Sequence, residues 1–161
     1  MKGASVGILA VRGGRDTLID ISSDRLLLPA SNQKTVTTAA ALHRLGGDFR
    51  FRTSIGYSGK IEDGILKGDL YIIGGGDPTT GSVNPIAEGL EATFGKWASF
   101  VREAGIREIE GWIIGDGRWL PGMMEQESWQ LNDSGTYYGS GVSGLSFYEN
   151  VQDFLVQAGE Q

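Results

Sequence analysis

Glycine is the feature of this sequence that most restricts its fold. It occupies 26 of the 161 positions, about 16% where soluble proteins usually have about 7%. The glycines stand between short apolar and β-branched runs and form no repeat. Because glycine weakens the interior of helices and strands and favours turns, the chain is expected to form short elements joined by tight bends. Apolar residues make up 40% of the sequence, which is enough for a folded core.

Composition and charge exclude several classes of function. The 14 Lys and Arg residues against 20 Asp and Glu give a net charge of −6. This argues against nucleic acid as a partner, because binding to the phosphate backbone depends on basic side chains. The sequence has no Cys and one His, His43, so it offers no disulfide, no thiolate nucleophile and no Cys-ligated or multi-His metal site. We therefore expect no metal and no cofactor.

The ends of the sequence predict neither a membrane span nor a leader. No apolar run reaches the length of a transmembrane segment, and the apolar stretch after Met1 is too short for a signal peptide. Residues 151–161 carry no signal that closes a fold. We therefore expect the chain to be a fragment of a longer protein or a truncated gene product.

Periodicity and turn residues predict short strands and two helices. Residues 6–11 and 17–21 are β-rich runs separated by a Gly pair, the pattern of a hairpin. A helix is expected over 31–45, because a proline precedes this run and a Gly pair follows it. A change of composition near Asp48 marks a candidate domain boundary. Further strands are expected at 49–57, 65–73 and 106–114, and a second helix lies within 85–104.

Ser31 and Lys34 are the strongest candidates for chemistry. On a helix, residues three apart share one face, so the hydroxyl and the amine are expected within mutual reach. A serine becomes a useful nucleophile when a neighbouring base takes its proton, and a lysine can be that base when burial or a nearby cation lowers its pKa. The alternative is that Ser31 only caps the helix N-terminus, where serine is a preferred residue.

Other sites are weaker. His43 lies 12 residues from Ser31 on the same predicted helix, about 18 Å away, so it cannot form a triad with that serine. Ser82-Val83-Asn84 matches a Ser-x-Asn pattern by letters and is interpreted as coincidence. Residues 139–144 match Gly-x-Gly-x-x-Gly without a preceding strand and are interpreted as a turn-rich loop. Asp77 is expected to accept hydrogen bonds from its local backbone.

Seven blocks, in order along the chain, together resemble the serine D-alanyl-D-alanine carboxypeptidases of the penicillin-binding-protein-4 type. They include Leu-Pro-Ala-Ser-Asn-Gln-Lys at 28–34, Gly-Gly-Asp-Pro-Thr at 75–79 and Tyr-Tyr-Gly-Ser-Gly-Val-Ser-Gly-Leu at 137–145. The other blocks are 49–53, 64–70, 109–111 and 129–133.

The resemblance implies an α+β fold in two parts. Residues 1–48 would be the N-terminal limb of a catalytic domain, with a strand hairpin and the nucleophile helix, and 49–161 the first part of a mostly-β inserted domain. Ser31 would be acylated by a peptidoglycan stem peptide or a β-lactam, with assistance from Lys34. The family's further Ser-x-Asn and Lys-Thr-Gly motifs lie beyond the matched residues, and no Lys-Thr-Gly occurs in the sequence. A periplasmic or cell-envelope location is implied by the family alone.

The resemblance also implies that Asp133 and Tyr138 bind substrate. Asp133 would pair with the free amine of a diamino-acid side chain, and Tyr138 would lie beside its aliphatic stem. The alternative for Asp133 is local capping of the backbone, since Asx-turns before glycine are common. The aromatic residues of this region also allow a second hypothesis, a cell-wall or peptide-binding module without catalysis. These two functions differ in one respect, because only the enzyme must be acylated by a β-lactam.

Overall fold

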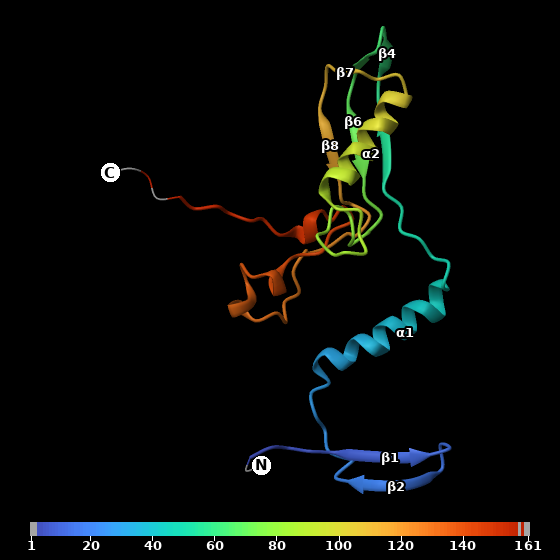
Figure 1. Cartoon of the computed structure of the whole chain (residues 1–161), viewed down its shortest axis with the longest axis vertical. Coiled ribbons are helices and arrows are strands. Elements are labelled where there is room, and N and C mark those ends of the chain that lie inside the picture. Colours follow the sequence, from blue (N-terminus) through green and yellow to red (C-terminus); the bar gives the residue numbers. More distant parts are fainter. Residues whose placement is uncertain (1–2, 158, 160–161) are drawn as a thin grey trace. The chain divides into compact units, whose positions relative to one another are not determined.

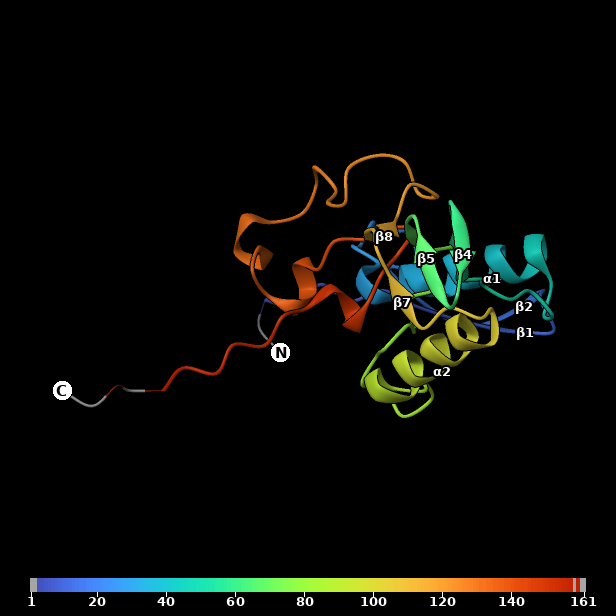
Figure 2. The same cartoon turned by 90° about the horizontal axis from the view of Figure 1, so that it is seen from above.

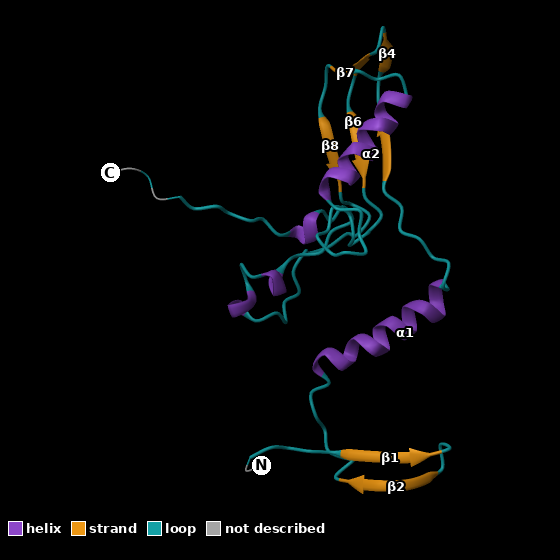
Figure 3. Ribbon diagram, viewed as in Figure 1, coloured by secondary structure: helices purple, strands orange, loops and turns teal. Residues whose placement is uncertain are grey.

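The computed structural model describes residues 3–157 and 159. The chain divides into two compact units between Phe49 and Arg50, and each unit is described by itself. Groups of strands are separated by single α-helices along the chain (Figure 3), which agrees with the expected α+β content. Within the described residues, neither α-helix combines the length and the apolar character that a membrane crossing requires.

The first unit begins with the predicted hairpin. Strands β1 (Ile8–Arg12) and β2 (Asp16–Ile21) pair antiparallel (Figure 1), with a register shift between Ala10 and Val11. The turn between them uses Gly13 and Gly14, whose φ angles of 59° and 73° lie in the left-handed region that glycine adopts without a steric penalty. The prediction of a hairpin around this Gly pair is confirmed.

A helix follows where the sequence predicts one, with a different start. The 3-10 turn η1 (Ala30–Asn32) leads directly into α1 (Gln33–Leu45). The helix ends at Gly46, whose φ is 82° and whose N–H donates to the Leu42 carbonyl at 2.9 Å. The last turn holds His43 and Arg44, where positive charge complements the helix dipole.

The second unit contains two three-stranded sheets. One has the order β3-β6-β8 and the other β4-β5-β7, with antiparallel β3–β6 and β4–β5 pairs and parallel β5–β7 and β6–β8 pairs. The strands are β3 (Ser54–Tyr57), β4 (Lys60–Glu62), β5 (Ile65–Lys67), β6 (Leu70–Ile73), β7 (Glu108–Ile109) and β8 (Ile113–Asp116).

The three long strands expected at 49–57, 65–73 and 106–114 are therefore wrong in extent. The first is limited to β3, and the other two each bend from one sheet into the other. At the bends, a Cβ on Gly59 would collide with the Lys67 carbonyl oxygen, and a Cβ on Gly68 would collide with that of Ser58. Only glycine allows the backbones to approach this closely. Each predicted strand is interrupted where the backbones approach closely at Gly59 and Gly68.

Asp69 forms hydrogen bonds to the neighbouring chain segments at this bend between the two sheets. Its Oδ1 accepts a hydrogen bond from the Trp112 backbone N–H at 2.8 Å, and its Oδ2 accepts one from the Tyr71 hydroxyl at 3.4 Å. The Asp69 carbonyl accepts from the Ser58 N–H at 2.9 Å, and the Asp69 N–H donates to Ser58 Oγ at 3.3 Å. One residue thus connects all three chain segments at the level where they bend.

Helix α2 (Leu90–Glu103) lies along the strands of this unit (Figure 1, Figure 2). The helix expected within 85–104 is confirmed, and it starts after Gly89, which has a φ of 77°. The core beneath it consists of three buried residues, with Leu66 fully inaccessible to solvent. The buried residues are Leu66, Leu70 and Ile106, and Ile55, Ile61, Val101 and Ile109 pack against them.

Removal of the Asp69 carboxylate should destabilise the second unit. We expect Asp69→Ala to lower the free energy of unfolding by about 1–3 kcal/mol, because the Trp112 N–H loses its acceptor. Asp69→Asn keeps a carbonyl oxygen and should recover most of this loss. Urea unfolding measures the difference, with Glu91→Ala on the exposed side of α2 as control. Equal stability of Asp69→Ala and the parent chain would contradict this role.

Candidate active site

The structure brings Ser31 and Lys34 together at the start of α1. Ser31 lies in the 3-10 turn η1, and Lys34 lies in the first turn of the helix. Lys34 Nζ donates a hydrogen bond to Ser31 Oγ at 3.2 Å. The expected contact between the hydroxyl and the amine is therefore present. At this distance a lysine in its neutral form is within reach of the hydroxyl proton.

Ser31 does not act as the helix cap. The N-cap position of α1 is Asn32, which has helical backbone angles and makes no capping hydrogen bond with its side chain. The hydrogen bond at Ser31 Oγ is the one from Lys34. The capping interpretation of Ser31 therefore has no support in the local geometry.

Ala30 is a feature of the site that the sequence did not reveal. Its φ of +44° lies in the left-handed region, which costs energy for a residue with a Cβ. Pro29 precedes it with ordinary right-handed angles, so the strain is confined to the residue before the serine. Such strained residues cluster at active sites. No residue type in this segment signals the strain, because alanine, unlike glycine, has no preference for this conformation.

Both members of the pair are exposed. Among residues 3–49, all are exposed except Ala10, which is half-buried. Ser31 and Lys34 therefore face water within their unit, and an electrostatic interaction between them is weakened by the high dielectric of their surroundings.

Asp133 and Tyr138 lie close together in the second unit. The 3-10 turns η2 (Leu131–Asp133) and η3 (Tyr137–Gly139) contact each other, and a Cβ on Gly139 would collide with the Asp133 carbonyl oxygen. Tyr138 is 69% exposed and stacks on Tyr137 with ring centroids 4.1 Å apart. The structure therefore places the aspartate next to an exposed aromatic surface.

The Asp133 carboxylate is not used for local capping in the described part of the chain. The turn is closed by backbone groups instead, since the Asp133 carbonyl accepts hydrogen bonds from the Thr136 N–H at 3.0 Å and the Thr136 hydroxyl at 2.7 Å. The half-buried Asp133 side chain lines a small hollow of about 110 Å³ together with Trp129 and Ser134. A carboxylate beside a hollow and an aromatic residue can receive a positively charged group.

Backbone hydrogen bonds join the two ends of the loop that carries Asp133 and Tyr138. After β8 the chain runs through 117–144 with short 3-10 turns and no strand (Figure 3). The Gly144 N–H donates to the Gly117 carbonyl at 3.0 Å, and the Val142 N–H donates to the Met124 carbonyl at 3.0 Å. The arms of the loop are thus fixed to each other, although its middle has no regular structure.

The weaker candidates behave as expected. Asp77 Oδ1 accepts a hydrogen bond from the Thr79 N–H at 2.8 Å, which confirms the local turn. Ser82 is buried and donates to a Glu149 carboxylate oxygen at 2.5 Å. The glycine-rich segment 139–144 is a loop that follows a 3-10 turn rather than a strand, so it lacks the context of a dinucleotide-binding motif.

Comparison with known proteins identifies the family of the chain. The model of the D-Ala-D-Ala carboxypeptidase 3 (S13) family matches residues 1–161. A D-alanyl-D-alanine carboxypeptidase from Actinomadura sp. (strain R39) is 31% identical over 153 residues, which cover 91% of this chain and 26% of the relative. The D-alanyl-D-alanine carboxypeptidase DacB of Haemophilus influenzae is 31% identical over 119 residues, covering 71% of this chain and 22% of the relative.

Solved structures give the same result. The crystal structure of penicillin binding protein 4 (dacB) from Haemophilus influenzae is similar with a TM-score of 0.75 and 26% identity, over 89% of this chain and 30% of that one. A second structure of that protein, complexed with a novel β-lactam, has a TM-score of 0.61 and 28% identity, over 73% of this chain and 25% of that one.

These similarities are all to proteins named D-alanyl-D-alanine carboxypeptidases or penicillin binding protein 4. The chain belongs to the D-Ala-D-Ala carboxypeptidase 3 (S13) family. It spans about a quarter of the length of the curated relatives that it matches.

The ion pair at the start of the 117–144 loop should titrate at unusually low pH. Hydrogen bonds from Arg118, at 2.9 Å from Nε and 2.7 Å from Nη2, lower the pKa of Asp116 from 3.8 to about 2. Because the folded-state pKa is lowered, the pair stabilises the fold above pH 4, and this contribution disappears as the pH falls through 2. An NMR titration of the Asp116 carboxyl carbon should therefore have its midpoint near 2.

Arg118→Gln should raise the Asp116 midpoint back toward 3.8, since the charged donors are removed. Arg107→Gln is the control, because Arg107 is an exposed arginine outside this ion pair. An unchanged Asp116 midpoint in Arg118→Gln would show that another group lowers the pKa.

Proposed function

We propose that this chain provides the nucleophile of a serine-type D-Ala-D-Ala carboxypeptidase. The reaction is hydrolysis of the terminal D-Ala-D-Ala peptide bond, or of cross-links, in peptidoglycan stem peptides. The observation that carries the proposal is the 3.2 Å contact between Lys34 Nζ and Ser31 Oγ in a member of this family. The strained backbone at Ala30, next to the serine, supports it.

The chemistry follows from the pair. Lys34 in its neutral form takes the Ser31 hydroxyl proton as Oγ attacks the carbonyl carbon of the penultimate D-Ala. The tetrahedral intermediate collapses, the proton passes to the departing D-Ala amine, and the peptide remains attached to Ser31 as an ester. Water then attacks this ester with Lys34 again as base, which releases the shortened peptide and restores the serine hydroxyl. The start of α1 favours negative charge, because its free N–H groups carry partial positive charge.

The proposal extends to the two units. Residues 1–48 would form the first limb of the catalytic domain, and 49–161 the first part of an inserted domain. Since the sequence has no Lys-Thr-Gly, the groups that complete the carboxylate and oxyanion contacts would come from outside these residues. The chain alone would then be a weak enzyme or an inactive one.

The partners follow from the same chemistry. We expect β-lactams to acylate Ser31, and the β-lactam complex of the Haemophilus influenzae penicillin binding protein 4 supports this expectation. Action on peptidoglycan would require a location in the periplasm or cell envelope.

A binding module without catalysis is the second candidate. The observation in its favour is the number of exposed aromatic residues in the 117–144 loop. They are Trp119 at 57%, Trp129 at 37%, Tyr137 at 68% and Tyr138 at 69% exposure. Such a module would bind peptide or cell wall without forming an ester to Ser31.

Acylation separates the two functions. We expect prolonged incubation of the chain with benzylpenicillin to add one penicilloyl group, mapped by mass spectrometry to the peptide that contains Ser31. Ser31→Ala should abolish the adduct, and Lys34→Ala should slow its formation about a hundredfold or more, because general-base catalysis typically contributes at least that factor.

Ser23→Ala is the matched control, since Ser23 is an exposed serine of the same unit without a lysine partner. Its adduct should form at the parent rate. Circular dichroism should show that all variants keep their helix. An adduct that persists in Ser31→Ala would rule out this serine as the nucleophile.

Asp133 is proposed to recognise the side-chain amine of the substrate. A carboxylate that pairs with an ammonium group in a partly desolvated hollow contributes roughly 1.5–3 kcal/mol. In NMR titrations, Asp133→Asn should therefore weaken binding of a peptide with an amine-terminated side chain about tenfold or more. Binding of a peptide whose side chain ends in a methyl group should not change.

Asp153→Asn controls for the loss of a negative charge, because Asp153 is an exposed carboxylate that pairs with the Tyr148 hydroxyl. Equal losses for both peptides in Asp133→Asn would mean that Asp133 supports the loop and does not read the amine.

A further inference from the structure

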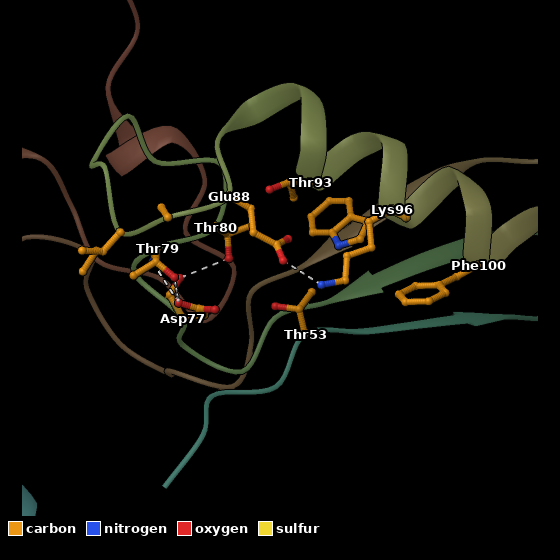
Figure 4. Close-up of a pocket in the computed structure, with 11 residues that line it drawn as sticks. Thr53, Asp77, Thr79, Thr80, Glu88, Thr93, Lys96 and Phe100 are labelled. Carbon is orange, nitrogen blue, oxygen red and sulfur yellow. Dashed lines mark hydrogen bonds and ion pairs between the residues drawn. The ribbon is translucent and has the colours of Figure 1, made fainter. Parts of the chain in front are cut away.

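A hollow between α2 and the preceding loops has no role in the proposed reaction. Its volume is about 360 Å³, within the range of small-molecule sites. All of its lining residues belong to the second unit, so it is separate from Ser31, and it shares no residue with the hollow beside Asp133. Figure 4 shows polar side chains from the loops and from α2 that surround it.

The polar groups of this hollow are mainly hydrogen-bond acceptors. Four threonines line it, and three of their hydroxyls already donate within the protein. Thr79 donates to Asp77 Oδ1 at 2.7 Å, and Thr93 donates to the Gly89 carbonyl at 2.6 Å. A hydroxyl whose proton is used keeps its lone pairs and can only accept further bonds. The hollow therefore fits a ligand with many donors.

The charged groups of the hollow are one ion pair and one further carboxylate, that of Asp77. Lys96 Nζ lies 2.8 Å from Glu88 Oε1, and this ion pair spans the hollow in Figure 4. Asp77 Oδ1 already accepts two hydrogen bonds from Thr79, one from its N–H and one from its hydroxyl. The ligand is therefore better described as neutral with many hydroxyl or amide donors.

Two aromatic residues of α2 supply an apolar wall. Trp97 is half-buried and lines the hollow together with Phe100. Phe94 meets the Trp97 ring edge-on, with centroids 5.8 Å apart and an interplanar angle of 87°, and so fixes its orientation. A site lined by both aromatic side chains and hydrogen-bond acceptors suits a sugar ring, whose C–H groups pack on aromatic rings and whose hydroxyl groups donate hydrogen bonds.

We propose that this hollow binds a neutral saccharide, specifically an N-acetylated hexosamine. The hydroxyl and amide donors of the sugar bind the threonine and carboxylate acceptors, and its C–H face packs on Trp97. The choice of an N-acetylated sugar rests on the proposed function, because such sugars form the glycan strands of peptidoglycan. The binding of a neutral sugar does not depend on that function. The site would hold the glycan strand while its stem peptide is processed elsewhere.

The test is an NMR titration of the ¹⁵N-labelled 161-residue chain with tri-N-acetylchitotriose. We expect saturable shifts of the backbone amides of Thr53, Thr79 and Thr93 and of the Trp97 indole N–H. No peptide or β-lactam is present, so the result is independent of Ser31 acylation. Cellotriose, which lacks the acetamido groups, should bind more weakly. Equal affinity for the two sugars would overturn the N-acetyl assignment and leave the acylation experiment unaffected.

Variants of the lining locate the site. Trp97→Ala should weaken binding about tenfold, and Thr53→Val, which keeps the side-chain shape, about threefold. Trp112→Ala is the matched control, since Trp112 is 76% exposed in the same unit and does not line the hollow. The spectrum of each variant reports whether it folds, and Thr53→Val tests the site even if Trp97→Ala does not fold.

Three results would overturn the proposal. The first is the absence of saturable shifts with chitotriose at about 10 mM, ten times a dissociation constant of 1 mM. The second is a set of shifts that maps to the 117–144 loop, or that stays unchanged in both Trp97→Ala and Thr53→Val. The third is stronger binding of lysine amide at the same residues, which would make the hollow a cation site.

Discussion

The fold of the second unit depends on the close approach of three backbone segments, those around Ser58, Asp69 and Trp112. Glycines at this level let the chains touch, and the Asp69 carboxylate satisfies the Trp112 N–H that the bend leaves without a ladder partner. The acceptor is charged, and hydrogen bonds to charged groups contribute more than those between neutral groups. The bend lets a short, glycine-rich chain form two sheets and one small core around Leu66.

Because the strands end near this core, the candidate binding residues of the second unit lie in the loops that connect its elements. The Asp77 turn, the loop from β8 onward and the segment before α2 all follow the ends of strands or precede a helix. Binding groups commonly lie on loops that a rigid scaffold positions. Backbone hydrogen bonds such as Gly144 to Gly117 keep these loops in place without regular secondary structure.

The sequence predicted the features that depend on local residue patterns. The hairpin around Gly13-Gly14, the helix after Pro29 and the contact of Ser31 with Lys34 follow from turn chemistry and helical spacing, and they are confirmed. The breaks in the predicted strands were missed, because they arise from contacts of Gly59 and Gly68 with residues distant in sequence. The hollow beside Trp97 was missed for the same reason. The strain at Ala30 was missed because alanine does not signal a positive φ. Catalysis by Ser31 and amine recognition by Asp133 stay predictions.

The exposure of α1 has a consequence for the contact between Ser31 and Lys34. A helix of 13 residues with no buried side chain gains little from packing, and helices of this length are marginal in water by themselves. The 3.2 Å contact between Lys34 and Ser31 exists only while the first helical turn is formed. Any surface that covers α1 would stabilise the helix and assemble the nucleophile in the same step. The contact between these two side chains is thereby coupled to the folding of α1.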